Sequence, residues 1–347
     1  MRAILTLLCL LFINGELMTQ SLDIKAADFY AELDASLFPN ESEYNSNGLP
    51  EGDWVIYELR EGGIYISAAE VTGEKRDTLN GEFLIRMEGQ FHNGKKMGLW
   101  TLYWVKKSAP FELVKFGEQL YESDVLVGEW NYYDLLGQQI STIRHDSAGF
   151  KVEEISYYAN STVSERVVIT DGEYSGIWYQ YDTSGNLVSE ATYRNKELTG
   201  PVKYYYPSGA LQLAGSFLLG QFDGEIMEYL ENGQVIKKYS YRNGALNGTY
   251  SKYSEEGILE FERNYVDGQA DGLYQYYYPN GQVWIAILFS NGKHWEVVGN
   301  YDQEGNEREK GSLDNGNGTI FYYHEDGRLR EVTTFRNGEK VNTESRN

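Results

Sequence analysis

The stretch GIWYQYDTSGNLVSEATYRN, residues 176–195, decides the fold of this chain. Its first six residues form a short aromatic run, which is typical of a β-strand. Asp182 to Gly185 is polar and ends in glycine, which adopts positive φ at little cost and so closes a tight turn. The residues from Asn186 to Tyr193 predict a second strand, with Leu187 and Tyr193 on one face by period two. The stretch is therefore a predicted β-hairpin.

The same pattern returns every 24 residues. Each unit has a first glycine, a tyrosine five residues later, a second glycine nine residues later and an aromatic residue seventeen residues later. The first glycines of the most regular units are Gly176, Gly200, Gly224, Gly248 and Gly272. Weaker matches extend the pattern to nine units, from Gly128 to about Val341, and the last unit slips by two residues to Gly318. Less regular starts occur upstream at Gly52, Gly81 and Gly98.

Two marker positions are predicted to be structural. The tyrosines expected to form a ladder along the sheet are Tyr133, Tyr157, Tyr181, Tyr205, Tyr229, Tyr253, Tyr277, Tyr301 and Tyr323. The glycines expected to close the turns are Gly137, Gly185, Gly209, Gly233, Gly257, Gly281, Gly305 and Gly327. Because 24 is even, each marker keeps its face of the sheet from unit to unit.

A second turn joins one unit to the next. It contains Asn243-Gly244, Asp267-Gly268, Asn291-Gly292 and Asn337-Gly338 in four of the units, and these dipeptides are strong hairpin signals. Connections this short leave no room for crossover helices, so the strands must be antiparallel. The fold class is therefore all-β, with hairpins forming an elongated twisted sheet. Two strands per unit, spaced by about 4.8 Å, give nine units a length on the order of 85 Å.

These motifs resemble the MORN-repeat variant found in bacterial YwqK-family antitoxins. GIWYQYDTSGNLVSEATYRN, GPVKYYYPSGALQLAGSF and GLYQYYYPNGQVWIAILFSNG carry the resemblance. It extends over residues 128–341, and over residues 51–127 in irregular form. The resemblance implies a string of β-hairpins used as a binding or scaffolding surface, with some members named antitoxins, and it supplies no catalytic residues.

The beginning of the chain has a different character. Arg2 followed by the apolar run Ala3–Ile13 predicts an export signal over residues 1–19, and the run is too short to span a bilayer. The alternative is a buried N-terminal helix. Residues 20–50 are predicted to hold a short helix from Ser21 to Leu33 and a polar linker, and the helix could cover the open end of the array. Residues 342–347 form a C-terminal tail.

Net charge limits the kinds of partner that the chain can bind, and cysteine content limits its chemistry. The chain has 30 Lys and Arg against 52 Asp and Glu, a net charge of −22. Nucleic acids and anionic membranes would be repelled, whereas a basic protein would be attracted. The one cysteine, Cys9, lies in the apolar start, which argues against disulfides, thiolate catalysis and cysteine-based zinc sites.

No motif in the sequence predicts catalysis. The four histidines, His92, His145, His294 and His324, lack metal-ligand spacing, and phosphate-binding and nucleophile-elbow motifs are missing. Paired carboxylates such as Glu153-Glu154 are expected among 52 acidic residues. Asp314-Asn-Gly-Asn-Gly318 resembles a calcium loop but lacks the distal glutamate, which favours an irregular turn. We expect no enzyme activity, no cofactor and no metal.

Exposed tryptophans could form a sugar-binding platform. Trp130 and Trp178 occupy a place in the unit that Val202, Ile226 and Tyr250 fill elsewhere, which indicates packing rather than ligand contact. The sequence therefore predicts an exported, non-enzymatic bacterial protein, periplasmic, cell-surface or secreted, that binds proteins or serves as a scaffold. Two alternatives stay open. One is an antitoxin or immunity protein that neutralises a basic toxin, and the other is a carbohydrate-binding envelope protein.

Overall fold

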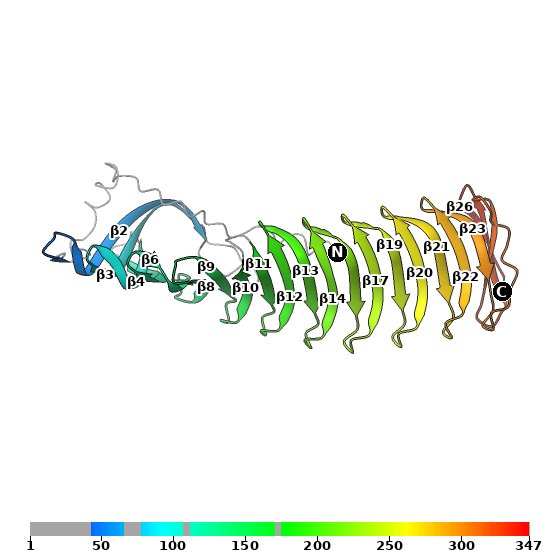
Figure 1. Ribbon diagram of the computed structural model, residues 1–347, viewed down its shortest axis with the longest axis horizontal. Coiled ribbons are helices and arrows are strands. Elements are labelled where there is room, and N and C mark those ends of the chain that lie inside the picture. The colour runs from blue at the N-terminus through cyan, green and yellow to red at the C-terminus, as the bar shows by residue number, and fades with distance from the viewer. Residues whose placement is uncertain (1–42, 66–77, 107–111, 171–174, 347) are drawn as a thin grey trace.

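The computed structural model describes residues 43–65, 78–106, 112–170 and 175–346, and every regular element in these ranges is a β-strand (Figure 1). The predicted export signal and the predicted helix Ser21–Leu33 lie outside the described residues. The strands stand side by side along one long axis, as Figure 1 shows. Hairpin follows hairpin, so strands pair antiparallel with strands close to them in the sequence. The all-β class and the open antiparallel sheet are confirmed.

One sheet holds 23 strands. The first part comprises β1 (Glu43–Tyr44), β2 (Pro50–Tyr65), β3 (Thr78–His92), β4 (Lys95–Lys106), β5 (Glu112–Glu122) and β6 (Val125–Leu126). The next part comprises β7 (Gly128–Tyr133), β8 (Gln139–His145), β9 (Lys151–Tyr157), β10 (Val163–Ile169), β11 (Gly176–Tyr181) and β12 (Leu187–Arg194).

The most regular hairpins complete this sheet. They comprise β13 (Glu197–Tyr205), β14 (Leu211–Leu218), β15 (Gln221–Phe222), β16 (Gly224–Tyr229), β17 (Val235–Arg242), β18 (Ala245–Leu246), β19 (Gly248–Tyr253), β20 (Leu259–Val266), β21 (Gln269–Tyr277), β22 (Val283–Ser290) and β23 (Lys293–Asn300). A separate three-stranded sheet follows, with β24 (Gly318–Tyr323), β25 (Leu329–Arg336) and β26 (Glu339–Ser345).

A β-bulge in each of the regular hairpins changes which side chains share a face. In the hairpin of β11 and β12, Gln180 pairs with Ser189 but Tyr181 pairs with Leu187, so one residue of β12 is extra. Opposed residues of an antiparallel pair point to the same face, and a bulge breaks the alternation. Leu187 therefore lies on the face of Tyr181, whereas Tyr193 lies on the other. The expectation that Leu187 and Tyr193 share a face was wrong for this reason.

The same shift recurs at the equivalent place in the hairpins of the other regular units. It fixes two chemically different surfaces. We call the surface with Val202, Phe217, Tyr250, Phe261 and Tyr274 the aromatic face. The opposite surface, with Glu190, Lys203 and Tyr205, is the polar face.

Backbone hydrogen bonds tie successive units together along the edge formed by the second turns. Asn243, Asp267 and Asn291 have φ between 46° and 49°, and the glycines that follow also have positive φ, which defines type I′ turns. The amide of Gly244 donates to the carbonyl of Phe222 at 2.9 Å, and the amide of Gly268 donates to that of Leu246 at 2.8 Å. Each turn is thus bonded to the unit before it.

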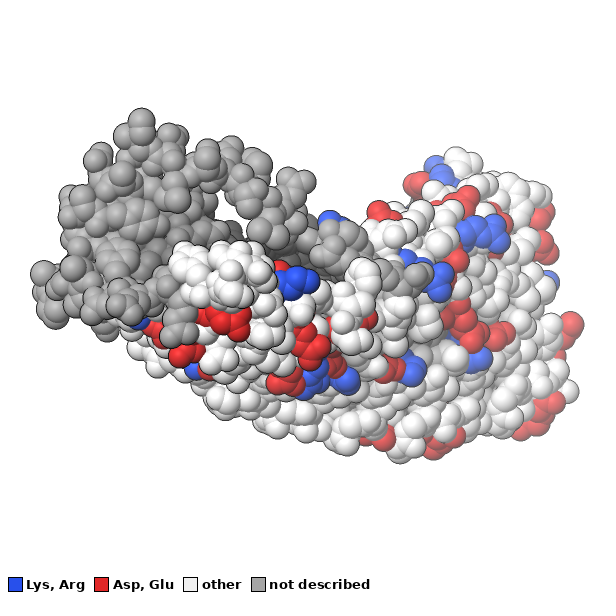
Figure 2. Space-filling model, turned by 60° about the vertical axis from the view of Figure 1, so that its left-hand side comes forward, with Lys and Arg blue, Asp and Glu red and all other residues white. Residues whose placement is uncertain are grey.

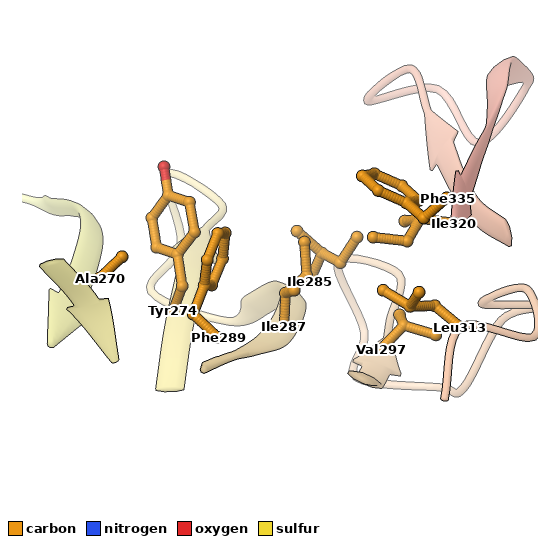
Figure 3. Packing of buried hydrophobic residues seen from close by; sticks show 9 residues of the cluster. All are labelled: Ala270, Tyr274, Ile285, Ile287, Phe289, Val297, Leu313, Ile320 and Phe335. Carbon is orange, nitrogen blue, oxygen red and sulfur yellow. The ribbon is translucent and has the colours of Figure 1, made fainter. Parts of the chain in front are cut away.

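The C-terminal end differs from a simple continuation of the array. The 24-residue period places the start of a unit at residue 296, after Gly272. This unit keeps its first strand, β23, and its turn, but the chain after the turn is held by single bridges such as Tyr301 to Glu307. Beyond the two-residue slip, β24–β26 form their own sheet instead of lengthening the first one. Figure 3 shows Ile320 and Phe335 of this small sheet facing Ile285, Val297 and neighbouring side chains of the array end.

This packing gives the array a covered end. Ile320 is 0% exposed and Leu313 is 2% exposed within the cluster. A sheet that ended at β23 would leave apolar side chains and an unpaired strand edge open to water, which invites aggregation. The three-stranded sheet β24–β26 therefore acts as a C-terminal cap.

Candidate interaction surface

The aromatic face carries a continuous chain of ring contacts. It runs from β14 across the array to the C-terminal cap, with centroid separations between 4.4 and 6.3 Å. Its members, in order of contact, are Phe217, Phe222, Tyr241, Tyr239, Tyr250, Phe261, Tyr274, Phe289, His294 and Phe335. Each such pair adds about 0.5–1.5 kcal/mol beyond burial. Most of these rings are only partly buried, and the neighbouring Tyr276 is 38% exposed.

A second chain of rings lies in the first part of the sheet. It links Tyr44, Trp54, Phe91, Trp100 and Tyr121 through edge-to-face contacts. Trp100 is 1% exposed and belongs to a buried cluster with Ile85 and Leu102. The irregular units before Gly128 therefore use the same packing as the regular ones.

The polar face carries alternating charges. Arg144 bonds Glu129 at 2.9 Å and also contacts Glu153, and Glu153 accepts a second bond from Arg166 at 2.5 Å. Burial alone would raise the pKa of Glu153, but the hydrogen bonds from Arg166 and Arg144 outweigh burial and lower it. Figure 2 shows acidic and basic side chains interspersed over the described part of the face in view.

The predicted tyrosine ladder lies on this polar face. Eight of its tyrosines are the last residue of the first strand of their unit, and Tyr301 forms a single bridge just after β23. Tyr133 donates to Glu118 at 2.8 Å, Tyr205 to Glu190 at 2.9 Å and Tyr277 to Glu262 at 3.4 Å. In each pair the carboxylate stands fifteen residues earlier. Burial and the hydrogen bond to Glu118 raise the pKa of Tyr133 to about 12.

The predicted turn glycines lie along one edge of the array. All eight have positive φ, between 79° and 88°. Where the turn begins with aspartate, as at Asp182, its carboxylate accepts the amides of Ser184 and Asn186 at 2.8 and 2.9 Å. The turn type is thus secured by short-range contacts of its own residues.

Two shallow depressions lie near the edge of the array that the second turns form. One of about 250 Å³ is lined by Val266, Asp267, Gln269, Asp271 and Asn291, next to the type I′ turns. Another of about 330 Å³ lies beside Thr170, Ser175 and Thr192. Neither contains a set of side chains arranged for acid–base or nucleophilic chemistry.

The four histidines lie apart from one another. His92 bonds Glu51 at 2.8 Å, His294 packs between Phe289 and Phe335, and His324 begins the turn between β24 and β25. Burial lowers the pKa of His145. Within the described ranges no three His, Cys, Asp or Glu side chains gather as metal ligands.

In the Asp314–Gly318 stretch, Asp314 and Asn317 bond each other across a tight turn. Among the described residues, no helix is long and apolar enough to cross a membrane.

Sequence reasoning missed one charged member of the aromatic face. Arg263 sits on β20 between Tyr250 and Tyr274, and its guanidinium carbon lies 4.1 Å from the centre of the Tyr274 ring. The equivalent place in other units holds Ala191, Gly215, Tyr239 or Ile287. A position so variable carries no repeat signal by which it could have been found.

Three solved structures match the chain at low sequence identity. TcdB2-TccC3 without its hypervariable C-terminal region matches at 11% identity and a TM-score of 0.17, over 84% of this chain and 16% of that one. TcdB2-TccC3-TEV matches at 13% identity and a TM-score of 0.15, over 88% and 19%. A TccC3 variant of the Photorhabdus luminescens Tc holotoxin pore matches at 11% and 0.14, over 92% and 20%. The chain thus spans a fifth or less of each.

No curated protein matches the chain. The MORN repeat variant family matches residues 174–195, 198–218, 222–243, 246–267 and 270–295. These matches coincide with the hairpins from β11 to β22, which share one bulge position and one turn geometry. Residues 174–295 are therefore five tandem repeats of the MORN variant family.

Proposed function

We propose that this chain is a non-enzymatic repeat protein whose array binds another protein or serves as a scaffold. The observation that supports this most is the unbroken chain of rings from Phe217 to Phe335 along one face of the sheet. Tyrosine and phenylalanine side chains supply much of the binding energy at protein interfaces. A surface long enough to follow several strands suits an extended partner.

The net charge indicates what kind of protein the partner is. With a net charge of −22, the chain attracts basic proteins and speeds their association at low salt. Neutralisation of a basic toxin is the specific form of this function that the charge favours. Export, suggested by Arg2 and the apolar run after it, would place the encounter outside the cytoplasm.

The proposal is tested by capture on the immobilised chain from Gln20 at low and moderate salt. We expect one stoichiometric basic protein that dissociates as the salt concentration rises. Tyr276→Ser on the aromatic face should weaken capture, whereas Leu219→Ser, 68% exposed at a turn, should leave it unchanged. Empty baits at both salt concentrations, or capture that neither substitution changes, would contradict a binding role for the aromatic face.

A further inference from the structure

Arg263 is a cation embedded among aromatic rings. Its guanidinium carbon lies 4.1 Å from the ring centre of Tyr274, 5.0 Å from that of Phe289 and 5.8 Å from that of Tyr265. Nη1 donates one hydrogen bond to the Tyr265 hydroxyl at 3.3 Å. The Nε atom is buried and has no hydrogen-bond partner. Among the described residues, the Tyr265 hydroxyl is therefore the one hydrogen-bond partner of the five N–H donors of this side chain.

No carboxylate neutralises this arginine within the part of the chain that the structure describes. The acidic residues of neighbouring strands are engaged elsewhere. Glu228 accepts from Lys237 at 2.8 Å, Glu260 from Lys252 at 2.5 Å, and Glu262 from Ser251 at 3.1 Å. Arg144 and Arg166 on the polar face both contact Glu153, by contrast.

Partly buried charges are normally paired, because the loss of hydration is costly. Cation–π contacts offset about 0.5–2 kcal/mol of this cost, but they do not use the N–H donors of the guanidinium. A bound carboxylate would satisfy the guanidinium in the two-pronged geometry that arginine favours. The surrounding rings would exclude water from this contact and so strengthen it.

We propose that Arg263 and the rings of Tyr265, Tyr274 and Phe289 bind the carboxylate of an Asp or Glu side chain that a protein partner presents among apolar residues. This inference rests on the proposed protein-binding function. A polymer with many acidic groups fits less well, since the net charge of −22 repels it. The equivalent places in the neighbouring units also hold Tyr239 and Ile287 instead of further cations.

The test uses small probes on the full chain. Phenylacetate carries a carboxylate next to a ring, and phenylacetamide is its neutral counterpart of the same shape. The Nε–H signal of Arg263, identified by its loss in Arg263→Gln, is followed by NMR during titration with each probe. We expect phenylacetate to shift this signal saturably and phenylacetamide to bind at least tenfold more weakly. Arg263→Gln should abolish phenylacetate binding, whereas Arg242→Gln, exposed at the end of β17, should retain it.

Each other outcome overturns the inference. Equal binding of both probes, or phenylacetate binding that survives Arg263→Gln, would show that the carboxylate is not recognised at Arg263. Saturable binding of glucuronate without phenylacetate would assign the site to an acidic sugar. If Arg263→Gln fails to fold, Arg263→Lys replaces it, with weakened but measurable phenylacetate binding expected.

Partner capture separates this inference from the proposed function. Negative probe titrations with undiminished capture by Arg263→Gln would overturn the Arg263 site alone. Loss of capture by the unsubstituted chain would overturn the proposed function, whatever the probes show.

Discussion

The hydroxyl of Tyr278 donates a hydrogen bond to the backbone carbonyl of Tyr301, 23 residues further along the chain, at 3.0 Å. Tyr158 bonds Tyr181 at 2.7 Å and Tyr206 bonds Tyr229 at 2.8 Å in the same way. In each case a tyrosine at the first turn of one unit holds the strand end of the next. These bonds are therefore inter-unit ties, and they come from the residue directly after the predicted ladder tyrosines.

Removing one tie should loosen the array locally. Tyr278 is 1% exposed, so Tyr278→Phe leaves the carbonyl of Tyr301 without this partner. We expect a loss of about 1–2 kcal/mol in unfolding free energy, read as a lower Tm. Pro279→Ala, exposed at the same turn, is the control. An unchanged Tm in Tyr278→Phe would show that the tie does not stabilise the array.

Replacing Glu165 or Glu190 with the neutral glutamine should change the Tm in opposite directions. Burial raises the pKa of Glu165; a hydrogen bond with Gln180 opposes this shift and the charge of Glu154 adds to it. The folded chain therefore disfavours the charged form at pH 7, and Glu165→Gln should raise the Tm by roughly 2 °C, a gain of about 1 kcal/mol or less. The gain should shrink as the pH falls through the raised pKa of Glu165 towards 4.5, the ordinary value.

Glu190 is the counterpart on the polar face. Burial would raise its pKa, but hydrogen bonds from Lys203 and Tyr205 outweigh burial and lower it. The stability that Glu190 contributes is present above its ordinary pKa of 4.5 and is lost as the pH falls through the lowered value. Glu190→Gln should cost about 0.2–1 kcal/mol at neutral pH. Thermal melts of Glu165→Gln and Glu190→Gln at several pH values measure both changes in Tm. Changes in Tm of the same sign at neutral pH would contradict the two predictions.

The turn glycines are required for their backbone conformation. Gly281 has a φ of 84°, and a Cβ there would meet no other atom within 4 Å. Gly281→Ala should therefore cost about 1 kcal/mol through backbone strain alone, and Gly281→Asn should cost less because asparagine tolerates positive φ. Urea unfolding of the two variants measures the difference. Equal costs would mean that steric contact, rather than φ, selects glycine.

The C-terminal cap should protect the end of the array. Ile320→Ala removes a fully buried side chain from the cluster with Ile285, Leu313 and Phe335, at an expected cost of about 2–5 kcal/mol. Hydrogen exchange should then speed up in β22–β26 and stay unchanged in β7–β12, because each unit contacts only its neighbours. Uniform acceleration along the whole chain would show that the array unfolds as one unit.

Much of the fold followed from local rules. The glycine at the end of Asp182–Gly185 and the dipeptide Asn243-Gly244 specify turn types, and turns this short require antiparallel neighbours. The faces could not be predicted so simply. The bulge at Leu187 reverses the alternation, and a bulge depends on pairing across strands rather than on the sequence of one strand.

The candidate surface was harder to predict than the fold. Residues that repeat, such as Tyr205 and Tyr277, are visible in one sequence, and they proved to bond glutamates on the polar face. Arg263 does not repeat. The aromatic surroundings of Arg263 come from Tyr274 and Phe289, which lie on other strands. Only the packed sheet brings these three residues together.

The measurement that tests the central claim most directly is hydroxyl-radical footprinting of the full chain, alone and with the protein it captures. Tyr276 on the aromatic face and Leu219 at a turn edge are both exposed in the free chain, at 38% and 68%. We predict that bound partner protects Tyr276 and leaves the oxidation of Leu219 unchanged. Protection of Leu219 with continued oxidation of Tyr276 would contradict the assignment of the aromatic face as the binding surface.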